Sequence, residues 1–417
     1  MSAAPPATTP AALARAVKRR VWPASWPLRL RSAPGLEDVV AAEVRRAADR
    51  AAADLDVAAL RQGDGLHVTS GSVAFTAPFD LTYALLAEVR TADVLSVRVG
   101  EHAAATTAMA YDHLARIPWA WWLPARGPVR CAVRSRRSHL RDAAGLERTL
   151  RRAVRGAGVA AEVPRDDRGA GGAEDVPTVR LELHRDRAAV WVDVAHGLHR
   201  RGAGKRSTAT TLRETTAAAL AHLAGAADAD LIIDPFCGSG TLLQEASAIA
   251  TQRPVAAGRP VALRTAPVWN EGRLRHALRR FEVAPAAPAL VGRDVDAAAA
   301  DVAAAALGEG ADVAVGDART LDFAALAAAH GARRPLLLAN PPYGRRAAAR
   351  GGAPDAVLGA VLDALAQAGA AGPAWRWGLL YPRPAVWAER PGVGEEAVRR
   401  IRIRGLSVAL ATGRTNG

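Results

Sequence analysis

The stretch Leu231–Thr241, LIIDPFCGSGT, constrains the fold of this 417-residue chain more than any other. A short apolar run ends in Asp234, turns through Gly238 and Gly240, and continues into a segment with helical spacing. A strand, a tight turn and a helix in this order form the ligand-binding unit of a doubly wound α/β sheet. The glycines let the backbone approach a ligand, and the helix start presents unpaired N–H groups. Because the third glycine of the dinucleotide fingerprint is absent, the pattern alone also fits an ordinary turn.

Strands and helices alternate after this motif, which predicts a mostly parallel sheet with one antiparallel strand. A long insert at residues 252–288 interrupts the alternation. Its sequence predicts a helix at 271–281 and does not indicate a role for the insert. The predicted strands cover 231–234, 289–294, 312–317, 336–340 and 377–381, followed by a hairpin of 400–403 and 406–410.

The first half of the chain predicts two smaller α+β units. Segments between residues 28 and 99 follow the β-α-β-β-α-β order of a ferredoxin-like unit. Asp80 is predicted to cap a helix that runs to Arg90, and Thr211–Glu214 to form a capping box. We expect a disordered tail at 1–26, a ferredoxin-like domain at 27–102, a second α+β domain at 103–196, a linker at 197–210 and the α/β domain at 211–417.

Positive charge is concentrated in one part of the chain. The formal net charge is +14, and residues 126–155 hold ten arginines against Asp142 and Glu147. A concentrated patch is typical of a phosphate-binding surface, although a solvated helix face is the alternative. The predicted RNA-binding residues are Arg130, Arg134, Arg136, Arg137, Arg141, Arg148, Arg151 and Arg152, with Arg200, Arg201 and Lys205 in the basic connector.

The chain has two cysteines, Cys131 and Cys237, too few for a disulfide framework or a four-cysteine zinc site. This favours a reducing, cytoplasmic location without a metal centre. No run of strongly apolar residues is long enough to span a membrane, so none is expected.

Two motifs together resemble a known family. Asp234–Thr241 with Asn340-Pro-Pro-Tyr-Gly344 is similar to S-adenosylmethionine-dependent methyltransferases that act on guanine N2 in ribosomal or transfer RNA, most of all the bacterial large-subunit enzymes. Gly35-Leu-Glu37, residues 111–119 and Leu198–Gly202 resemble their ferredoxin-like plus THUMP module. The resemblance implies a class I, Rossmann-like methyltransferase sheet and an RNA-binding THUMP domain at 103–196. The chain departs from the family at Gly202-Ala-Gly-Lys205, where the family has an aromatic residue after Arg-Gly. This difference bears on how the module docks.

S-adenosylmethionine needs a glycine turn, an acid for its ribose and a polar group for its adenine. Asp294, at a strand end, is predicted to bind the ribose, with Asp296 as the weaker rival, and Asp317 the adenine amino group. The predicted cofactor-binding residues are Asp234, Pro235, Phe236, Cys237, Gly238, Ser239, Gly240, Thr241, Asp294, Val295, Asp317 and Ala318. Cys237 is expected to pack in the turn and not to act as a nucleophile.

Asn340, Pro341, Pro342 and Tyr343 are the predicted catalytic residues. The asparagine oxygen and a main-chain carbonyl would accept the hydrogens of an exocyclic amine and aim its lone pair at the methyl group, while Tyr343 stacks on the base. The same tetrapeptide fits adenine N6 or a protein glutamine amide, and transfer RNA remains open as a substrate. A non-enzymatic RNA-binding protein with a decayed transferase domain is the third alternative.

Overall fold

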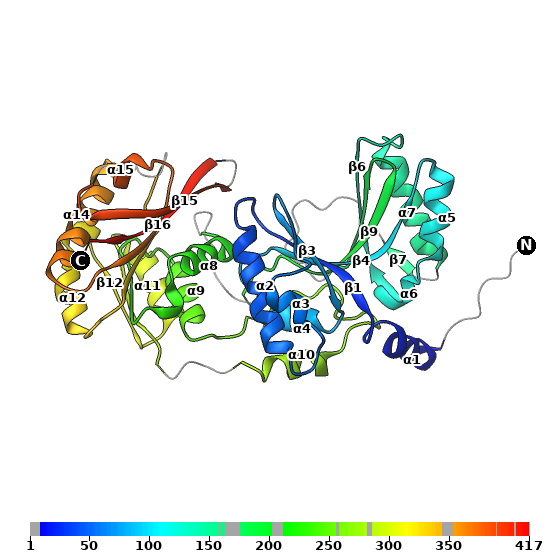
Figure 1. The fold of residues 1–417 in the computed structure, drawn as a ribbon, viewed down its shortest axis with the longest axis horizontal. Coiled ribbons are helices and arrows are strands. Elements are labelled where there is room, and N and C mark those ends of the chain that lie inside the picture. The colour runs from blue at the N-terminus through cyan, green and yellow to red at the C-terminus, as the bar shows by residue number, and fades with distance from the viewer. Residues whose placement is uncertain are drawn as a thin grey trace, which may run out of the picture. The chain divides into compact units, whose positions relative to one another are not determined.

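The computed structural model describes residues 9–157, 160–162, 176–201, 212–255, 258–281, 286–343, 353–388, 390–403 and 406–416. Thr211, Lys205 and Gly344 lie outside this part of the chain. The chain forms two compact units (Figure 1). The first comprises Met1–Ser32, Val40–Arg200 and Val255–Arg280, and the second Ala33–Val39, Arg201–Pro254 and Phe281–Gly417.

The second unit is built on a seven-stranded sheet in the order β12-β11-β10-β13-β14-β16-β15. The five strands from β12 to β14 are parallel, and β16 runs antiparallel to both of its neighbours, which confirms the predicted topology. The strands are β10 Leu231–Asp234, β11 Ala289–Asp294, β12 Ala311–Val315, β13 Pro335–Ala339, β14 Arg376–Tyr381, β15 Val393–Ile403 and β16 Leu406–Thr415.

Helices cover both faces of this sheet, which explains why β10 and β13 are continuous apolar runs. Ile232 and Leu336 pack in a core with α8, α9 and α11, whereas Ile233 and Leu337 pack in a second core with α12 and α14 (Figure 1). The helices are α8 Glu214–Leu223, α9 Thr241–Ala250, α11 Ala297–Leu307, α12 Phe323–Ala329, α14 Pro354–Ala371 and α15 Ala385–Ala388, with 3-10 turns at Ala226–Asp228 and Ala318–Thr320.

The first unit contains another seven-stranded sheet, in the order β2-β3-β1-β4-β9-β8-β6. Because β4 pairs with β9, the strands of both predicted N-terminal domains share this one sheet, and their division into two domains stays a prediction. Its strands are β1 Ser25–Arg31, β2 His67–Thr69, β3 Ser72–Pro78, β4 Val94–Ala103, β6 Arg130–Arg136, β8 Thr178–His184 and β9 Arg187–His196; β5 Arg126–Pro128 pairs separately with β7 Ala160–Glu162. The helices are α1 Pro10–Arg20, α2 Glu37–Ala51 (shared between the units), α3 Ala58–Gln62, α4 Leu81–Glu88, α5 Thr107–Arg116, α6 Trp119–Trp122, α7 Ala143–Gly156 and α10 Glu271–Leu278.

The insert between β10 and β11 of the second unit's sheet belongs to the first unit. The buried guanidinium of Arg259 donates to the main-chain oxygens of Leu86 and Leu198, at 2.8 and 3.1 Å. The main-chain N–H of Asn270 donates to the hydroxyl of Tyr83 at 3.0 Å, beside the contact of α10 with α4. These hydrogen bonds tie residues 255–280 to the N-terminal sheet.

Two local predictions differ from the structure. Within the predicted disordered tail, α1 is ordered because Thr9 caps it and Val17 is buried. Asp80 does not cap α4, which ends at Glu88, since its carboxylate forms an ion pair with Arg273 instead. The predicted capping box depends on Thr211, which lies outside the described residues, and α8 begins at Glu214. Among the described residues, no helix has the length and apolar character needed to cross a membrane.

Candidate active site

The glycine turn and the Asn-Pro-Pro-Tyr segment leave the sheet at the same edge. They follow β10 and β13, which are adjacent and parallel, with Ile233 opposite Leu337. The chain order reverses here, because β11 lies on the other side of β10. Ligands of open α/β sheets bind outside the carboxyl ends of the strands at such a reversal. The structure therefore brings the two predicted halves of the site together.

The two glycines of the turn have different roles. Both have positive φ, 52° for Gly238 and 77° for Gly240. A Cβ added to Gly240 would lie 3.3 Å from Ala303 of α11, whereas one added to Gly238 would meet nothing within 4 Å. Gly240 therefore lets α11 pack against the turn, and the backbone at Gly238 faces open space. This opening fits the predicted approach of a cofactor.

Two carboxyl groups flank the turn. Asp234 is buried, and its Oδ1 accepts a hydrogen bond from the Phe236 N–H at 3.0 Å. Burial, with a smaller contribution from the nearby Asp294 charge, raises the pKa of Asp234 to about 8. Asp294 Oδ2 accepts from the Gly238 N–H at 2.9 Å. Asp294 thus stands beside the turn, whereas its rival Asp296 caps α11 by accepting from Ala298 and Ala299.

The predicted adenine-binding residues lie farther along the same edge. Asp317 follows β12, but its carboxylate accepts from the Arg319 main-chain N–H and Nε, at 2.9 and 3.0 Å. These bonds hold the pKa of Asp317 below its usual range. Ala318 is buried, and Val295 exposes 58% of its surface after β11. Val295 thus offers an apolar surface for a ring, whereas the Asp317 carboxylate is already engaged by Arg319.

Cys237 packs inside the turn. Its side chain is buried, and burial together with the Asp234 charge raises the pKa of the thiol. Because the thiolate is the reactive form, this environment favours packing over nucleophilic chemistry, as expected.

Asn340 carries a polar atom without a partner. Its side-chain Oδ1 is buried and has no hydrogen-bond donor in the part of the chain that the structure describes. Pro341 and Pro342, which follow it, have no N–H to offer. Buried acceptors in proteins nearly always have a donor, so an orphaned one at a strand end marks a place for a ligand donor such as an amine.

Aromatic and charged side chains that the sequence analysis missed stand next to this segment. Tyr343 contacts Tyr381 edge to face, with ring centroids 6.0 Å apart. The Tyr381 hydroxyl donates to Asp355 Oδ1 at 2.5 Å, and Arg383 pairs with Asp355 at 3.1 Å. Burial raises the pKa of Tyr381 to about 12. The signal was available, because Tyr381 ends β14, the next parallel strand of the same edge.

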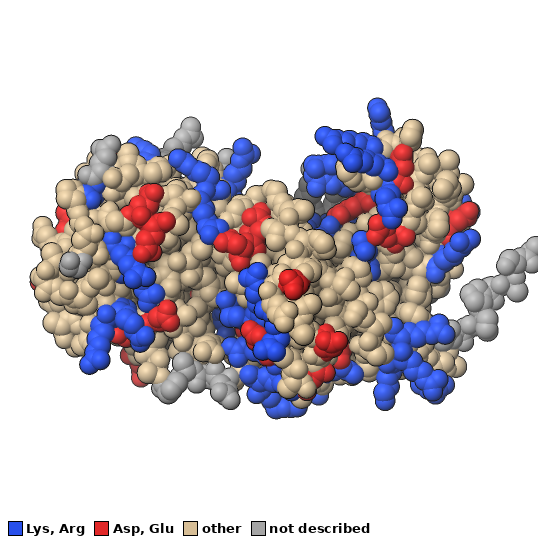
Figure 2. Space-filling view, in the orientation of Figure 1, with Lys and Arg blue, Asp and Glu red and all other residues tan. Residues whose placement is uncertain are grey.

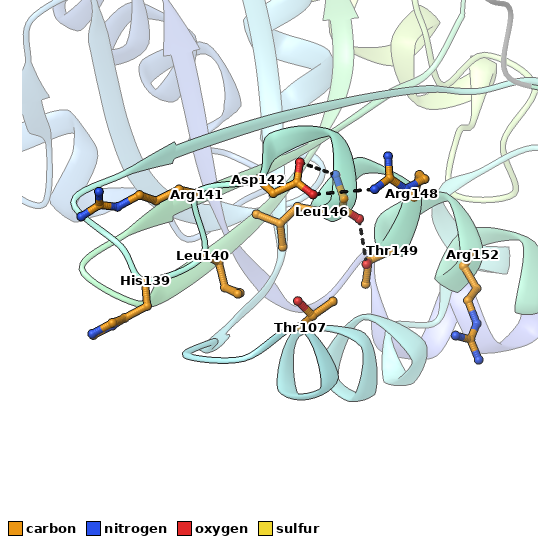
Figure 3. A pocket seen from close by; sticks show the side chains of 10 residues that line it. Thr107, His139, Leu140, Arg141, Asp142, Leu146, Arg148, Thr149 and Arg152 are labelled. Carbon is orange, nitrogen blue, oxygen red and sulfur yellow. Dashed lines mark hydrogen bonds and ion pairs between the residues drawn. The ribbon is translucent and has the colours of Figure 1, made fainter.

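The predicted RNA-binding arginines divide between distinct places. Figure 2 shows basic side chains gathered over β6, which carries Arg134 and Arg136. Arg141, Arg148 and Arg152 surround a cavity of about 660 Å³, and Arg148, Arg151 and Arg152 line a second of about 390 Å³. In Figure 3, the carboxylate of Asp142 faces Arg148, 3.7 Å away.

Both cavities lie in the first unit and not beside Gly238 or Asn340. Arg201 differs from the other predicted arginines, because its guanidinium pairs with the buried Glu245 at 2.8 Å. Its position favours a structural role.

Comparison with known families supports the identity of the second unit. Residues 201–372 match the family model described as "RMKL-like, methyltransferase domain". This range of the chain is similar to RMKL-like methyltransferase domains. The matched range contains the glycine turn, Asp294, Asp317 and Asn340.

Curated proteins similar to this chain include two named ribosomal RNA large subunit methyltransferase K/L. The one from Syntrophotalea carbinolica is 28% identical over 295 residues, which is 67% of this chain and 40% of the relative. The one from Vibrio campbellii is 47% identical over 73 residues, 17% of this chain and 10% of the relative. The chain thus aligns with less than half the length of these relatives.

Solved structures show that the fold extends over nearly the whole chain. A predicted N6-adenine-specific DNA methylase from Listeria monocytogenes has a TM-score of 0.70 at 20% identity, covering 93% of this chain and 96% of that one. SMU.472 complexed with SAH has a TM-score of 0.68 at 21% identity, covering 93% and 97%. TrmN from Thermus thermophilus has a TM-score of 0.63 at 21% identity, covering 94% and 100%. These likenesses establish the class I methyltransferase fold.

Proposed function

We propose that this chain transfers a methyl group to the exocyclic N2 amine of a guanine in structured RNA, most of all 23S ribosomal RNA. The methyl donor is S-adenosylmethionine, which supplies an electrophilic methyl group on its sulfonium. The methyltransferase domain and the names of the two curated relatives support an RNA substrate. The arginine-lined cavities of the first unit support RNA binding by that unit. The two free cysteines are in keeping with a cytoplasmic enzyme.

The orphaned Oδ1 of Asn340 is the observation that carries this proposal. An exocyclic amine is a poor nucleophile because its lone pair is delocalised into the ring. With Oδ1 and a main-chain carbonyl each accepting one amine hydrogen, the lone pair would become localised on nitrogen and point at the methyl group. The N–C bond would form as the S–C bond breaks, S-adenosylhomocysteine would leave, and the methylated amine would lose one proton to solvent. Positioning of this kind can supply roughly 7–11 kcal/mol of the barrier without a general base.

Residues around Asn340 would hold the two reactants. The open turn at Gly238 and the carboxylate of Asp294 would bind the donor's amino-acid and ribose parts, and Val295 its adenine. Tyr343, whose ring contacts the edge of Tyr381, would stack on the target base. A paired base must leave its stack at a cost of a few kcal/mol, so loops or flipped nucleotides are the expected targets.

Replacing Asn340 by Ala tests this assignment. We expect the rate of methyl transfer to fall by about 10²–10³ because a positioned hydrogen-bonding group is lost, while the Kd for S-adenosylmethionine stays near that of the wild type. Transfer is measured with radiolabelled donor on ribosomal RNA, and donor binding by calorimetry. Asn270→Ala is the control, because Asn270 uses its Oδ1 to cap α10. Full turnover by Asn340→Ala would refute the catalytic role.

Adenine N6 is the alternative acceptor, because the same asparagine oxygen can accept a hydrogen from either amine. Transfer RNA is the alternative substrate. An inactive RNA-binding protein is the non-enzymatic alternative, and the intact turn and Asn340-Pro-Pro-Tyr343 weigh against it.

A further inference from the structure

The sheet of the first unit has one apolar and one polar face. Side chains alternate along each strand. Leu28 and Leu30 of β1 are buried on the apolar face, in register with Val97 and Leu95 of β4. The opposite face carries a cluster, here called the sheet-face cluster, of Arg29, Arg31, Ser96, Arg180, Glu182, Trp191 and Asp193.

Two of the three arginines in this cluster pair with carboxylates, although the Nε of Arg29 has no acceptor among the described residues. Arg29 donates two hydrogen bonds to Glu182, at 2.6 and 2.9 Å, and its guanidinium lies 4.0 Å above the Trp191 ring. Arg180 donates to Asp193 through Nε and Nη2, at 3.0 and 2.7 Å. Asp193 is completely buried and also accepts from Ser96 at 2.7 Å. The two carboxylates therefore already have bidentate partners.

Arg31 is left over. Within the described residues its guanidinium has no carboxylate partner, and its Nε is buried without a hydrogen-bond acceptor. Burial and the positive charge of Arg180 lower the pKa of Arg31. A half-buried cation beside two other guanidinium groups is unfavourable unless an anion joins it.

We propose that the sheet-face cluster binds a phosphate group of the RNA backbone, with Arg31 as its direct partner. Three guanidinium groups face two carboxylates, which leaves one positive charge for an anion. The planar fork of arginine matches a phosphate in a bidentate geometry. Arg134 of β6 lies in register with Glu182 and is exposed, so basic side chains continue from the cluster to the edge of the sheet. The RNA source of the phosphate rests on the proposed function.

Arg29 and Arg180 lie beside this site, and their contribution differs from that of Arg31. Their charges are neutralised by Glu182 and Asp193, and the stack on Trp191 fixes Arg29 across the sheet. These contacts fix the neighbours of Arg31, so that its guanidinium would need little rearrangement to meet a ligand. A purely structural role for Arg31 would require a partner that these contacts do not provide.

Arg31→Gln tests the site with RNA. We expect it to weaken binding of a labelled ribosomal RNA fragment about tenfold and to reduce the slope of log K against log salt by about 1, because one phosphate contact is lost. Binding is measured by fluorescence anisotropy over a salt series. Arg61→Gln is the matched control on the same unit, since its pair with Asp49 is half exposed on both sides. Equal affinity and slope in wild type and Arg31→Gln would overturn the proposal.

Inorganic phosphate separates this proposal from the proposed function. We expect phosphate to raise the Tm of the wild type more than that of Arg31→Gln, and Arg31→Gln to be at least as stable as the wild type without phosphate, because an unpaired charge is removed. If the wild type binds no RNA but keeps this phosphate difference, the RNA substrate fails and the anion site stands. If Arg31→Gln does not fold, Arg31→Lys replaces it, with an intermediate phosphate response expected. An identical response of wild type and variant overturns the site.

Discussion

Asp234 ends β10 with a carboxyl group that is almost completely buried. Its pKa is about 8 in the folded protein and about 3.9 in an unfolded chain. The folded state therefore binds this proton more tightly than the unfolded chain does. The stabilisation from proton binding at Asp234 is complete below about pH 4 and is lost as the pH rises to about 8.

Asp234→Asn removes this titration. Between pH 5 and pH 8 we expect the Tm of the wild type to fall more than that of Asp234→Asn, which keeps an oxygen for the Phe236 N–H. Asp301→Asn, an exposed position on α11, is the control and should follow the wild type. Parallel Tm curves for wild type and Asp234→Asn would show that Asp234 does not hold its proton.

At the level of single residues, the sequence predicted which residues lie at the carboxyl ends of the strands. It missed the side chains that contact them. Gly238, Asp294 and Asn340 could be named because each lies at or just after the end of a strand whose apolar run is easily recognised. The contact of Asp317 with Arg319 could not, since it depends on the local path of the chain after β12. Tyr381 and Asp355 come together only through the packing of α14 against the sheet.

Among the elements, the turn between β10 and α9 allows the sharpest comparison. An alanine at either glycine would adopt a left-handed conformation, which costs about 1–2 kcal/mol. Gly240→Ala should lose more stability than Gly238→Ala, because only its Cβ would press against Ala303. Gly238→Ala should mainly weaken donor binding, since its Cβ would enter the open space. Urea unfolding and calorimetry measure the two effects, and the reverse order of stability would contradict the assigned roles.

The parallel strands were predictable as elements, but several helix ends were not. Strands buried on both faces are continuous apolar runs, and their bounds follow directly from the sequence. The predicted side-chain cap of α4 was wrong because the carboxylate of Asp80 pairs with Arg273, which lies in an insert distant in sequence. The hairpin strand β15 was predicted too short, since its exposed residues 395–400 show no alternation of apolar side chains.

At the scale of the whole molecule, the described residues form two seven-stranded sheets that would serve two tasks, beside the small pair of β5 and β7. The second unit carries the orphaned acceptor Asn340, and the first unit carries the arginine-lined cavities and the sheet-face cluster. The sequence showed the excess of arginine, but it could not show that Arg201 pairs with Glu245 or that the Nε of Arg31 has no acceptor among the described residues. Such pairing depends on strand neighbours far apart in the chain.

The central claim is that this chain methylates guanine N2 in RNA, and analysis of modified nucleosides tests it most directly. Ribosomal and transfer RNA from a deletion strain are digested and compared with the parent strain by mass spectrometry. We predict that N2-methylguanosine is lost from 23S ribosomal RNA and restored by the wild-type gene but not by Asn340→Ala. Unchanged N2-methylguanosine, or loss of N6-methyladenosine in its place, would contradict the account.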